Sequence, residues 1–232
     1  MATSFRYTVA LLRSLVEKYR VFYSESFSNF RTVGAIAPSS VLLAKAIVNP
    51  LHHRSDHPIS VLEVGPGTGV FTAEILKYLS FGDCFDIYEL NPKFYEYLIH
   101  ILHKQQLTER GIYYHLHKAD IRSLRESREY DFIISGLPFN SFDAQTLDEI
   151  LKVLMSHLTP TGVFAYFEYS LPPQFRGYFL TSLERVRMQR ARTTVNQFIR
   201  KHQFHCDQVW WNLPPAKVRY CRKNLWTGLP AP

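Results

Sequence analysis

Residues 60–79 read SVLEVGPGTGVFTAEILKYL and carry the strongest local signal in the chain. The run SVLEV at 60–64 has the composition of a buried strand, and VFTAEILKYL at 70–79 has the pattern of a helix. The loop between them contains Gly65, Gly67 and Gly69. These glycines let the backbone turn tightly and approach a ligand without a Cβ atom in the way. Because ligands bind at the carboxyl ends of strands in open α/β sheets, we expect a binding site at this loop.

The rest of the chain alternates between strand and helix patterns. We expect strands at 84–90, 112–117, 130–135 and 162–169, and helices at 91–104 and 142–158. After a basic helical stretch at 185–201, the runs 204–211 and 216–221 flank NLPP as two strands of a hairpin would. Such alternation predicts a parallel sheet with helices on both faces. The predicted fold is therefore α/β and Rossmann-like, with a mostly parallel seven-stranded sheet and a C-terminal antiparallel hairpin.

An N-terminal segment precedes this pattern. Residues 5–22 are predicted to form an amphipathic helix, with Arg6, Arg13 and Arg20 opposite its apolar face. A second helix is expected to begin near Ser39 or Ser40, either of which could cap it. We therefore divide the chain into a segment at 1–58 and an α/β domain at 59–232.

The charge of the chain is unevenly distributed. The 232 residues have a formal net charge of +7, from 27 Lys and Arg against 20 Asp and Glu. Residues 1–60 hold 7 basic and 3 acidic side chains, 61–170 hold 9 and 15, and 171–232 hold 11 and 2. Basic ends around an acidic middle favour a polyanionic partner, which is either a nucleic acid or an anionic lipid surface, over a merely solvated face.

Composition also excludes several classes of protein. A chain with 46% hydrophobic and 20% charged residues is not generally disordered. Cys84, Cys206 and Cys221 form no CxxC pair, which argues against a disulfide scaffold and for a reducing, cytoplasmic compartment. We find neither a cleavable signal nor the roughly 18 unbroken apolar residues of a membrane span. His202, His205 and Cys206 lack a second ligand cluster, so we expect no metal site.

The spacing of Glu63, Gly65, Gly67 and Gly69 resembles the ExGxGxG loop of class I S-adenosylmethionine-dependent methyltransferases. In such a fold Glu89, 26 residues after Glu63, could accept both ribose hydroxyls of the cofactor. Asp120, which follows the third predicted strand, could receive the adenine amino group. The alternatives are that Glu89 is simply solvated and that Asp120 caps a short helix.

The stretch SGLPF at 135–139 follows the fourth predicted strand. Methyltransferases that act on amino nitrogens carry a related NPPY-type tetrapeptide here, whose side-chain amide and a backbone carbonyl bind the nitrogen. This chain has Ser135 and Gly136 in place of the Asn or Asp and the Pro or Leu of those families. Ribosomal RNA adenine dimethylases would be expected to keep the Asn, so the departure argues against base methylation.

A wider set of motifs resembles the soluble bacterial phospholipid N-methyltransferases, which methylate phosphatidylethanolamine. The motifs are RTVGAIAPSS (31–40), VLEVGPGTGVFT (61–72), YELNP (88–92), SGLPF (135–139) and VWWNLPPAKVRYCRK (209–223). The resemblance implies a cytoplasmic enzyme that visits the inner membrane leaflet, uses S-adenosylmethionine and adds up to three methyl groups. Glu168 departs from this family, since a small polar residue is expected there.

The chemistry of amine methylation suggests roles for the residues at the substrate end. The lipid amine arrives largely as an ammonium and must lose a proton before it attacks, and Glu168 or Tyr169 could hold the cation or accept that proton. Phe139, Tyr166 and Tyr169 could offer aromatic faces to a methylated cation, or they could belong to the core. Ser135 would border both the cofactor and the amine.

The two ends of the chain are candidates for contact with the lipid. Residues 31–40 could fold over the cofactor as a lid, and helix amides near Ser39 and Ser40 would suit the lipid phosphate. The helix at 5–22 could lie in an anionic membrane interface or dock on the protein's own core. The basic side chains near the C-terminus could bind the same lipid or grip RNA; they are Arg185, Arg187, Arg190 and Arg192. Methylation of nucleic acid and a catalytically silent binding module are therefore the alternatives to lipid methylation.

Overall fold

The computed structural model describes residues 38–125, 127–139, 142–170, 182–212 and 215–223, without the side chains of 38–40 and 182–188. These residues form a seven-stranded sheet with the strand order β3-β2-β1-β4-β5-β7-β6. Strands β1 to β5 pair with one another in parallel, and β7 is antiparallel to both of its neighbours, β5 and β6, so that β6 runs in the same direction as β1 to β5. The strands are β1 (Ser60–Val64), β2 (Cys84–Tyr88), β3 (Tyr113–His117), β4 (Tyr130–Ser135), β5 (Leu158–Tyr169), β6 (Gln203–Val209) and β7 (Ala216–Cys221). The predicted Rossmann-like fold with a C-terminal antiparallel hairpin is confirmed.

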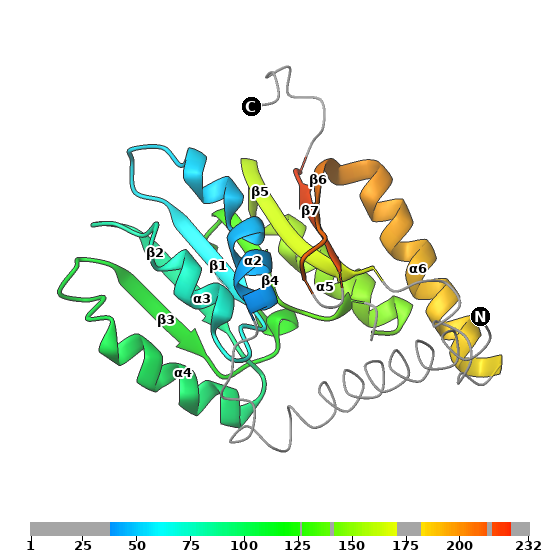
Figure 1. The fold of residues 1–232 in the computed structure, drawn as a ribbon, viewed down its shortest axis with the longest axis horizontal. Coiled ribbons are helices and arrows are strands. Elements are labelled where there is room, and N and C mark those ends of the chain that lie inside the picture. The colour runs from blue at the N-terminus through cyan, green and yellow to red at the C-terminus, as the bar shows by residue number, and fades with distance from the viewer. Residues whose placement is uncertain (1–37, 126, 140–141, 171–181, 213–214, 224–232) are drawn as a thin grey trace, which may run out of the picture.

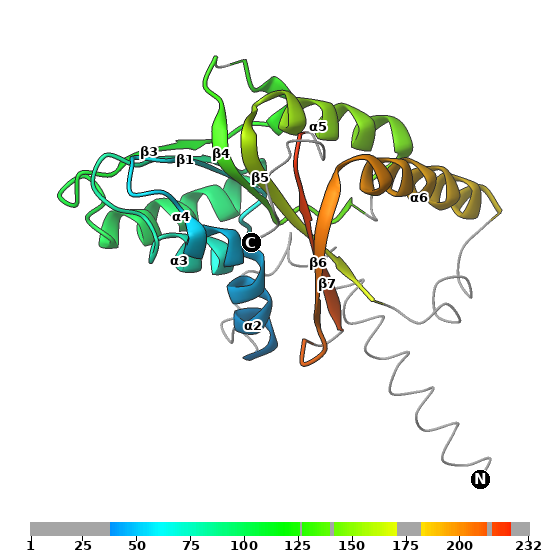
Figure 2. The ribbon, with the colours of Figure 1, turned by 90° about the horizontal axis from the view of Figure 1, so that it is seen from above.

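Helices cover both faces of the sheet (Figures 1 and 2). The helices α2 (Pro38–Ile47), α3 (Val70–Ile75) and α4 (Pro92–Lys104) lie on one face, and α5 (Ala144–Ser156) and α6 (Ser182–His202) on the other. Two short 3-10 helices complete the described elements, η2 (Asn49–His53) and η3 (Ile121–Ser123). Each face has its own hydrophobic core, which explains why the central strands are apolar on both sides.

Local sequence accounts for the starts of α4 and α5. The Asn91 side chain accepts hydrogen bonds from the amides of Lys93 and Phe94, and Pro92 occupies the first helical position. The Asp143 side chain caps α5 in the same way. Both caps satisfy amides that would otherwise lack a partner at a helix start.

Several element boundaries differ from those expected, among them those of α3, β5 and α2. Helix α3 ends at Ile75 rather than at residue 79, because the amides of Lys77 and Tyr78 bond to carbonyls three residues back and tighten the chain into turns. Strand β5 begins at Leu158 and passes through an irregularity in its register with β4 before Val163. Helix α2 begins at Pro38, so Ser39 and Ser40 lie within its first turn and not at its cap.

The part of the N-terminal segment that the structure describes belongs to the sheet's own core. Leu43, Ala44 and Ile47 of α2 are buried in the same cluster as β1 and β7 residues. The Tyr220 hydroxyl of β7 donates to the Ala46 carbonyl at 2.6 Å. Residues 1–37, which include the expected 5–22 helix and most of the expected lid, lie outside the described residues. In the described ranges, no helix is long and apolar enough to cross a membrane.

The order of the strands reverses between β1 and β4. From β1 the chain steps outward to β2 and β3, then returns to β4 on the other side of β1. The loops after β1 and β4 therefore start from neighbouring strand ends and leave the sheet in opposite directions. Open α/β sheets bind their ligands in the crevice between two such loops. These two loops are the glycine loop and SGLPF.

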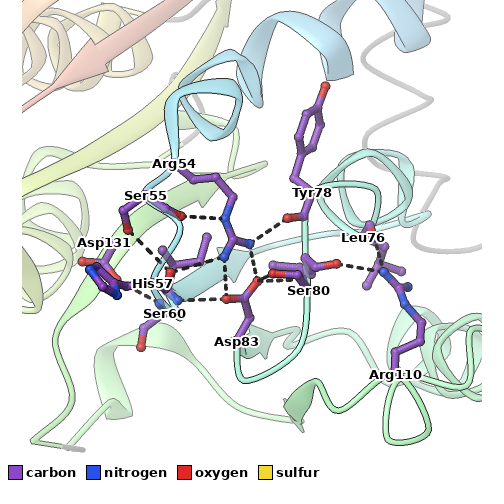
Figure 3. Close-up of polar contacts among 12 residues, drawn as sticks. Arg54, Ser55, His57, Ser60, Leu76, Tyr78, Ser80, Asp83, Arg110 and Asp131 are labelled. Atoms are coloured by element: carbon purple, nitrogen blue, oxygen red, sulfur yellow. Dashed lines mark hydrogen bonds and ion pairs between the residues drawn. The ribbon is translucent and has the colours of Figure 1, made fainter.

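A buried ion pair fastens the opposite, amino-terminal edge of the sheet (Figure 3). Asp83, directly before β2, is fully buried and accepts hydrogen bonds from the Ile59 amide at 2.9 Å and the Ser80 amide at 2.7 Å. Arg54 pairs with both of its carboxylate oxygens and also donates to the Tyr78 carbonyl at 2.8 Å. The network therefore joins the residues after η2 and α3 to the starts of β1 and β2.

Replacing Asp83 with Ala should lower the free energy of unfolding by about 2–4 kcal/mol, because it leaves Arg54 and two backbone amides without their acceptor. Urea unfolding at neutral pH measures the change. Asp56→Ala is the matched control, since Asp56 lies in the same loop but is exposed. Equal stabilities of the two variants would show that the network does not hold this edge.

Candidate active site

The glycine loop turns through three left-handed residues. Gly65, Gly67 and Gly69 have φ angles of 67°, 56° and 75°, which residues with a Cβ adopt only with strain. The Gly65 amide donates to the Tyr88 carbonyl at 2.9 Å, so the loop is tied to the end of β2. A Cβ atom built on Gly67 would meet no atom within 4 Å. The middle of the loop thus faces open space, as a backbone cradle for a ligand requires.

Glu89 follows β2 and holds this loop. Its carboxylate accepts hydrogen bonds from the Gly67 amide at 3.0 Å and from the Asn91 amide at 2.7 Å. The side chain is 6% exposed, and burial raises its pKa although the amides of Asn91, Gly67 and Leu90 oppose the shift. A carboxylate offers about four acceptor sites, so Glu89 can still accept a hydroxyl donor while it holds the loop.

Glu63, in β1, is a fully buried acid beneath the same loop. One carboxylate oxygen accepts the Thr72 hydroxyl at 2.7 Å, and the other has no hydrogen-bond partner. Burial raises the Glu63 pKa to about 8; the hydrogen bond from Thr72 opposes this shift, and the nearby Glu89 carboxylate contributes to it. Glu63 is therefore mostly protonated at neutral pH, which avoids two buried negative charges under one loop.

Asp120 caps the short helix η3, which is the alternative to its expected role toward an adenine amino group. Its carboxylate accepts from the Arg122 amide at 2.8 Å and pairs with the Arg122 guanidinium at 2.8 Å. These bonds lower the Asp120 pKa. Arg122 also reaches Glu149 of α5 at 2.9 Å, so Asp120 is positioned by a network that spans β3 and α5. Its role toward an adenine amino group stays a prediction.

The SGLPF loop packs directly on the glycine loop. The Gly136 amide donates to the Val64 carbonyl at 2.8 Å, and the buried Ser135 hydroxyl accepts from the Leu137 amide at 3.2 Å. A Cβ atom on Gly136 would lie 2.4 Å from the carbonyl oxygen of Gly65. This close approach explains why the chain has glycine where NPPY-type tetrapeptides have Pro or Leu.

Phe139 and Tyr166 lie in the core, which is the second of the two roles that the sequence left open for them. Phe139 is 1% exposed, and its ring packs 4.9 Å from that of Tyr166. Both belong to the hydrophobic cluster beneath α5 and α6. Phe139 turns inward because it follows Pro138 into the space between β4 and α5, where apolar burial outweighs exposure to solvent.

Glu168 and Tyr169 lie at the expected edge but on opposite faces of β5. Ser135, the last residue of β4, pairs with Tyr166, so β5 continues for three residues past the end of β4. Successive side chains alternate along a strand, which puts Glu168 on the α6 face with Ser135 and leaves Tyr169 packed against the core on the α2 side. The α6 face of β5 therefore presents the Glu168 carboxylate near SGLPF, and the α2 face presents the Tyr169 phenol.

Arg219 is a partner of Glu168 that sequence reasoning missed. Its guanidinium donates to Glu168 at 3.0 Å and to the Gln203 side chain at 2.6 Å. It faces Tyr166 across β5 and β7, and its charge holds the Glu168 carboxylate in place. The signal in the sequence was the alternation of AKVRYC, which puts Lys217 and Arg219 on the face opposite Val218.

Several expected contacts fall outside what the structure describes. Arg6, Arg13 and Arg20 lie in residues 1–37, and the side chains of Ser39, Ser40, Arg185 and Arg187 are not described. Arg190 and Arg192 are described and exposed on α6. In the described part of the chain, no group of three or more His, Cys, Asp or Glu residues could hold a metal ion.

Glu63→Gln should change how stability depends on pH. A folded-state pKa of about 8 means that the folded protein keeps a proton that the unfolded chain loses near pH 4.5. The wild type should therefore lose stability relative to the variant as pH rises from about 5 to 8, by about 1.4 kcal/mol per pH unit. Urea unfolding of both proteins across this range tests it, and parallel curves would contradict a protonated Glu63.

Gly136→Ala should destabilise the fold by about 1–3 kcal/mol, because the new methyl group would press on a backbone carbonyl that cannot rotate away. Gly162→Ala is the control, since the two nearest atoms to its Cβ belong to the side chains of Leu158 and Thr159, and the nearest backbone carbonyl, of Asp131, is farther away at 3.0 Å. Thermal unfolding of the two variants measures the difference. A larger loss for Gly162→Ala would show that the two loops are not locked together.

Comparisons with known proteins agree with this geometry. Residues 61–162 match a family described as a methyltransferase domain. An ornithine lipid N-methyltransferase of Singulisphaera acidiphila is 23% identical over 214 residues, which cover 89% of this chain and 97% of that protein.

Solved structures share the fold at low sequence identity. A putative O-methyltransferase from Klebsiella pneumoniae has a TM-score of 0.58 at 13% identity, and 88% of each chain is covered. The 1,6-didemethyltoxoflavin-N1-methyltransferase of Burkholderia thailandensis has a TM-score of 0.58 at 14% identity, with 91% of this chain and 90% of that chain covered.

The residues at the carboxyl edge fit S-adenosylmethionine. The open cradle at Gly67 would hold its amino-acid part, and Glu89 has an acceptor for its ribose. The strand order places this cradle beside SGLPF, where a methyl acceptor would enter. Together with the matched domain, these features make the chain an S-adenosylmethionine-dependent methyltransferase of class I fold.

Proposed function

We propose that this enzyme methylates the primary amine of a membrane aminolipid, with phosphatidylethanolamine as the leading substrate. The observation that carries the proposal is the end-to-end likeness to an ornithine lipid N-methyltransferase, which extends beyond the matched domain to 89% of the chain. Ornithine lipid and phosphatidylethanolamine share a primary amine that is anchored to acyl chains. The two differ in the groups around that amine, so ornithine lipid is the second substrate to test.

The chain's own residues would supply position rather than strong acid–base catalysis. When bound, S-adenosylmethionine provides a methyl group on a positively charged sulfur, and in-line attack depends mainly on alignment. The Gly136–Gly65 contact holds the acceptor loop beside the cradle. The backbone carbonyls of SGLPF can accept hydrogen bonds from the amine, while the Ser135 hydroxyl accepts one from the Leu137 amide.

Glu168 is proposed to attract the lipid ammonium electrostatically. Its pairing with Arg219 keeps the carboxylate fixed on the Ser135 face, a short distance beyond the end of β4. The pair is part-buried, so its field is screened less than that of an exposed pair. The amine proton would pass to Glu168 or to solvent through a water, as a general base needs only to be within such reach.

Transfer of labelled methyl groups tests the proposal. With labelled S-adenosylmethionine, vesicles of phosphatidylethanolamine or ornithine lipid should become labelled on the lipid amine, and RNA should not. Gly67→Arg should lower the rate at least about 100-fold, because the side chain fills the cradle and strains the backbone. Gly82→Arg is the control, since Gly82 also has a left-handed φ but lies at the opposite edge. Label in RNA with none in either lipid would overturn the proposal.

A further inference from the structure

Two neighbouring tryptophans are exposed at the tip of the β6–β7 hairpin. Trp210 is 68% exposed and Trp211 is 85% exposed, although both are large apolar side chains. Isolated apolar side chains on a surface need no explanation, but two adjacent indoles at a turn form an apolar projection. We propose that this tip is the element by which the enzyme docks on the lipid bilayer; the inference rests on the proposed lipid substrate.

The tip lies at the same edge as the active site. Val209 and Ala216, which flank it, pair with each other, and Ala216 also pairs with Tyr169 at the end of β5. The amide of Ser170 donates to the Pro215 carbonyl at 2.6 Å, so the turn is bonded to the residue that follows β5. Since β5 runs three residues past the end of β4, the turn bonded to its end lies roughly 10 Å beyond the end of β4. A flat surface that approaches this edge of the sheet would therefore contact the indoles before it reaches the end of β4.

The core holds the hairpin in place. Ala216 and Val218 are buried in the cluster beneath α2, and Val209 packs against it. Asn212 within the turn is buried, and its amide donates to the Val209 carbonyl. The two indoles are thus the exposed part of an otherwise anchored turn. A rigid support reduces the entropy that the indoles lose on binding.

Neighbouring side chains suit an anionic lipid surface. Helix α6 runs into β6, so its first half lies at the same edge as the hairpin tip, and Arg190 and Arg192 are exposed there. Helix α2 contacts β6 and β7, and its start lies beside the tip in both views of the ribbon (Figures 1 and 2). Leu42, in the first half of α2, is also exposed. Indoles prefer the boundary between headgroups and acyl chains, and arginines add attraction to anionic headgroups.

This arrangement favours a bilayer over a nucleic acid. Stacking on bases would require rings set along a basic groove, whereas these two exposed indoles belong to adjacent residues of a single turn. A bilayer needs only that the indoles enter the interface together. Docking at this edge would also bring the headgroups close to SGLPF and Glu168, so the substrate would not have to leave the membrane.

The full-length protein with Trp226→Phe leaves Trp210 and Trp211 as its only tryptophans, because the chain contains three. Vesicles of phosphatidylethanolamine and phosphatidylglycerol should shift its emission to the blue, and brominated acyl chains should quench it. In the wild-type background, Trp210→Ala and Trp211→Ala should each weaken flotation with these vesicles about tenfold. Phe81→Ala is the matched control, since Phe81 is 82% exposed but lies at the opposite edge of the sheet.

The double variant Trp210→Ala/Trp211→Ala should lose methylation of vesicles but keep cofactor binding and methylation of a short-chain, water-soluble phosphatidylethanolamine. Unchanged flotation of the double variant, or indoles that are shielded from acrylamide before lipid is added, would overturn the docking proposal even if the lipid is methylated. Retention on RNA that depends on these tryptophans, with no vesicle binding, would also overturn it. Vesicle binding that depends on the indoles, without any lipid methylation, would leave docking supported and refute the proposed function instead.

Discussion

The site depends on one close approach between two backbones. Gly136 lies so near the Gly65 carbonyl that neither an alanine nor a proline would fit without a shift. The contact joins the loop proposed to receive the cofactor to the loop proposed to face the methyl acceptor, at the point where the strand order reverses. Methyl transfer depends on the alignment of the methyl donor with its acceptor. A direct contact between the two loops fixes their relative position and so favours this alignment. The same contact limits the acceptor tetrapeptide to a glycine at its second position.

Two buried acids beneath the glycine loop have different tasks because their surroundings differ. Glu89 accepts hydrogen bonds from backbone amides and so holds the loop, while Glu63 has one hydroxyl donor and an unpartnered oxygen. Their mutual repulsion adds to the burial of Glu63 and favours its proton. A second charge at Glu63 would repel the carboxylate that anchors Gly67. The protonation of Glu63 therefore stabilises the bond that shapes the cradle.

Much of the fold could be predicted from the sequence, since β1 and β4 begin and end where their apolar runs do, and Asn91 marks the start of α4. The end of α3 could not, because its last turn tightens through bonds that leave no mark on the apolar pattern. The motif spacing placed Glu89 and Ser135 at the correct edge. It could not show that Phe139 turns inward, nor that Arg219 meets Glu168, because both depend on packing between distant segments.

The antiparallel hairpin links chemistry to the proposed docking surface. Arg219 of β7 fixes Glu168, while the turn that precedes β7 carries the exposed indoles. Both lie on one rigid strand pair that is hydrogen-bonded to β5 and buried against α2. The proposed docking surface and the strand that holds the carboxylate are therefore joined by a continuous hydrogen-bonded ladder. In a parallel sheet without this hairpin, β5 would end as an open edge, and neither the ion pair nor the projecting turn would exist.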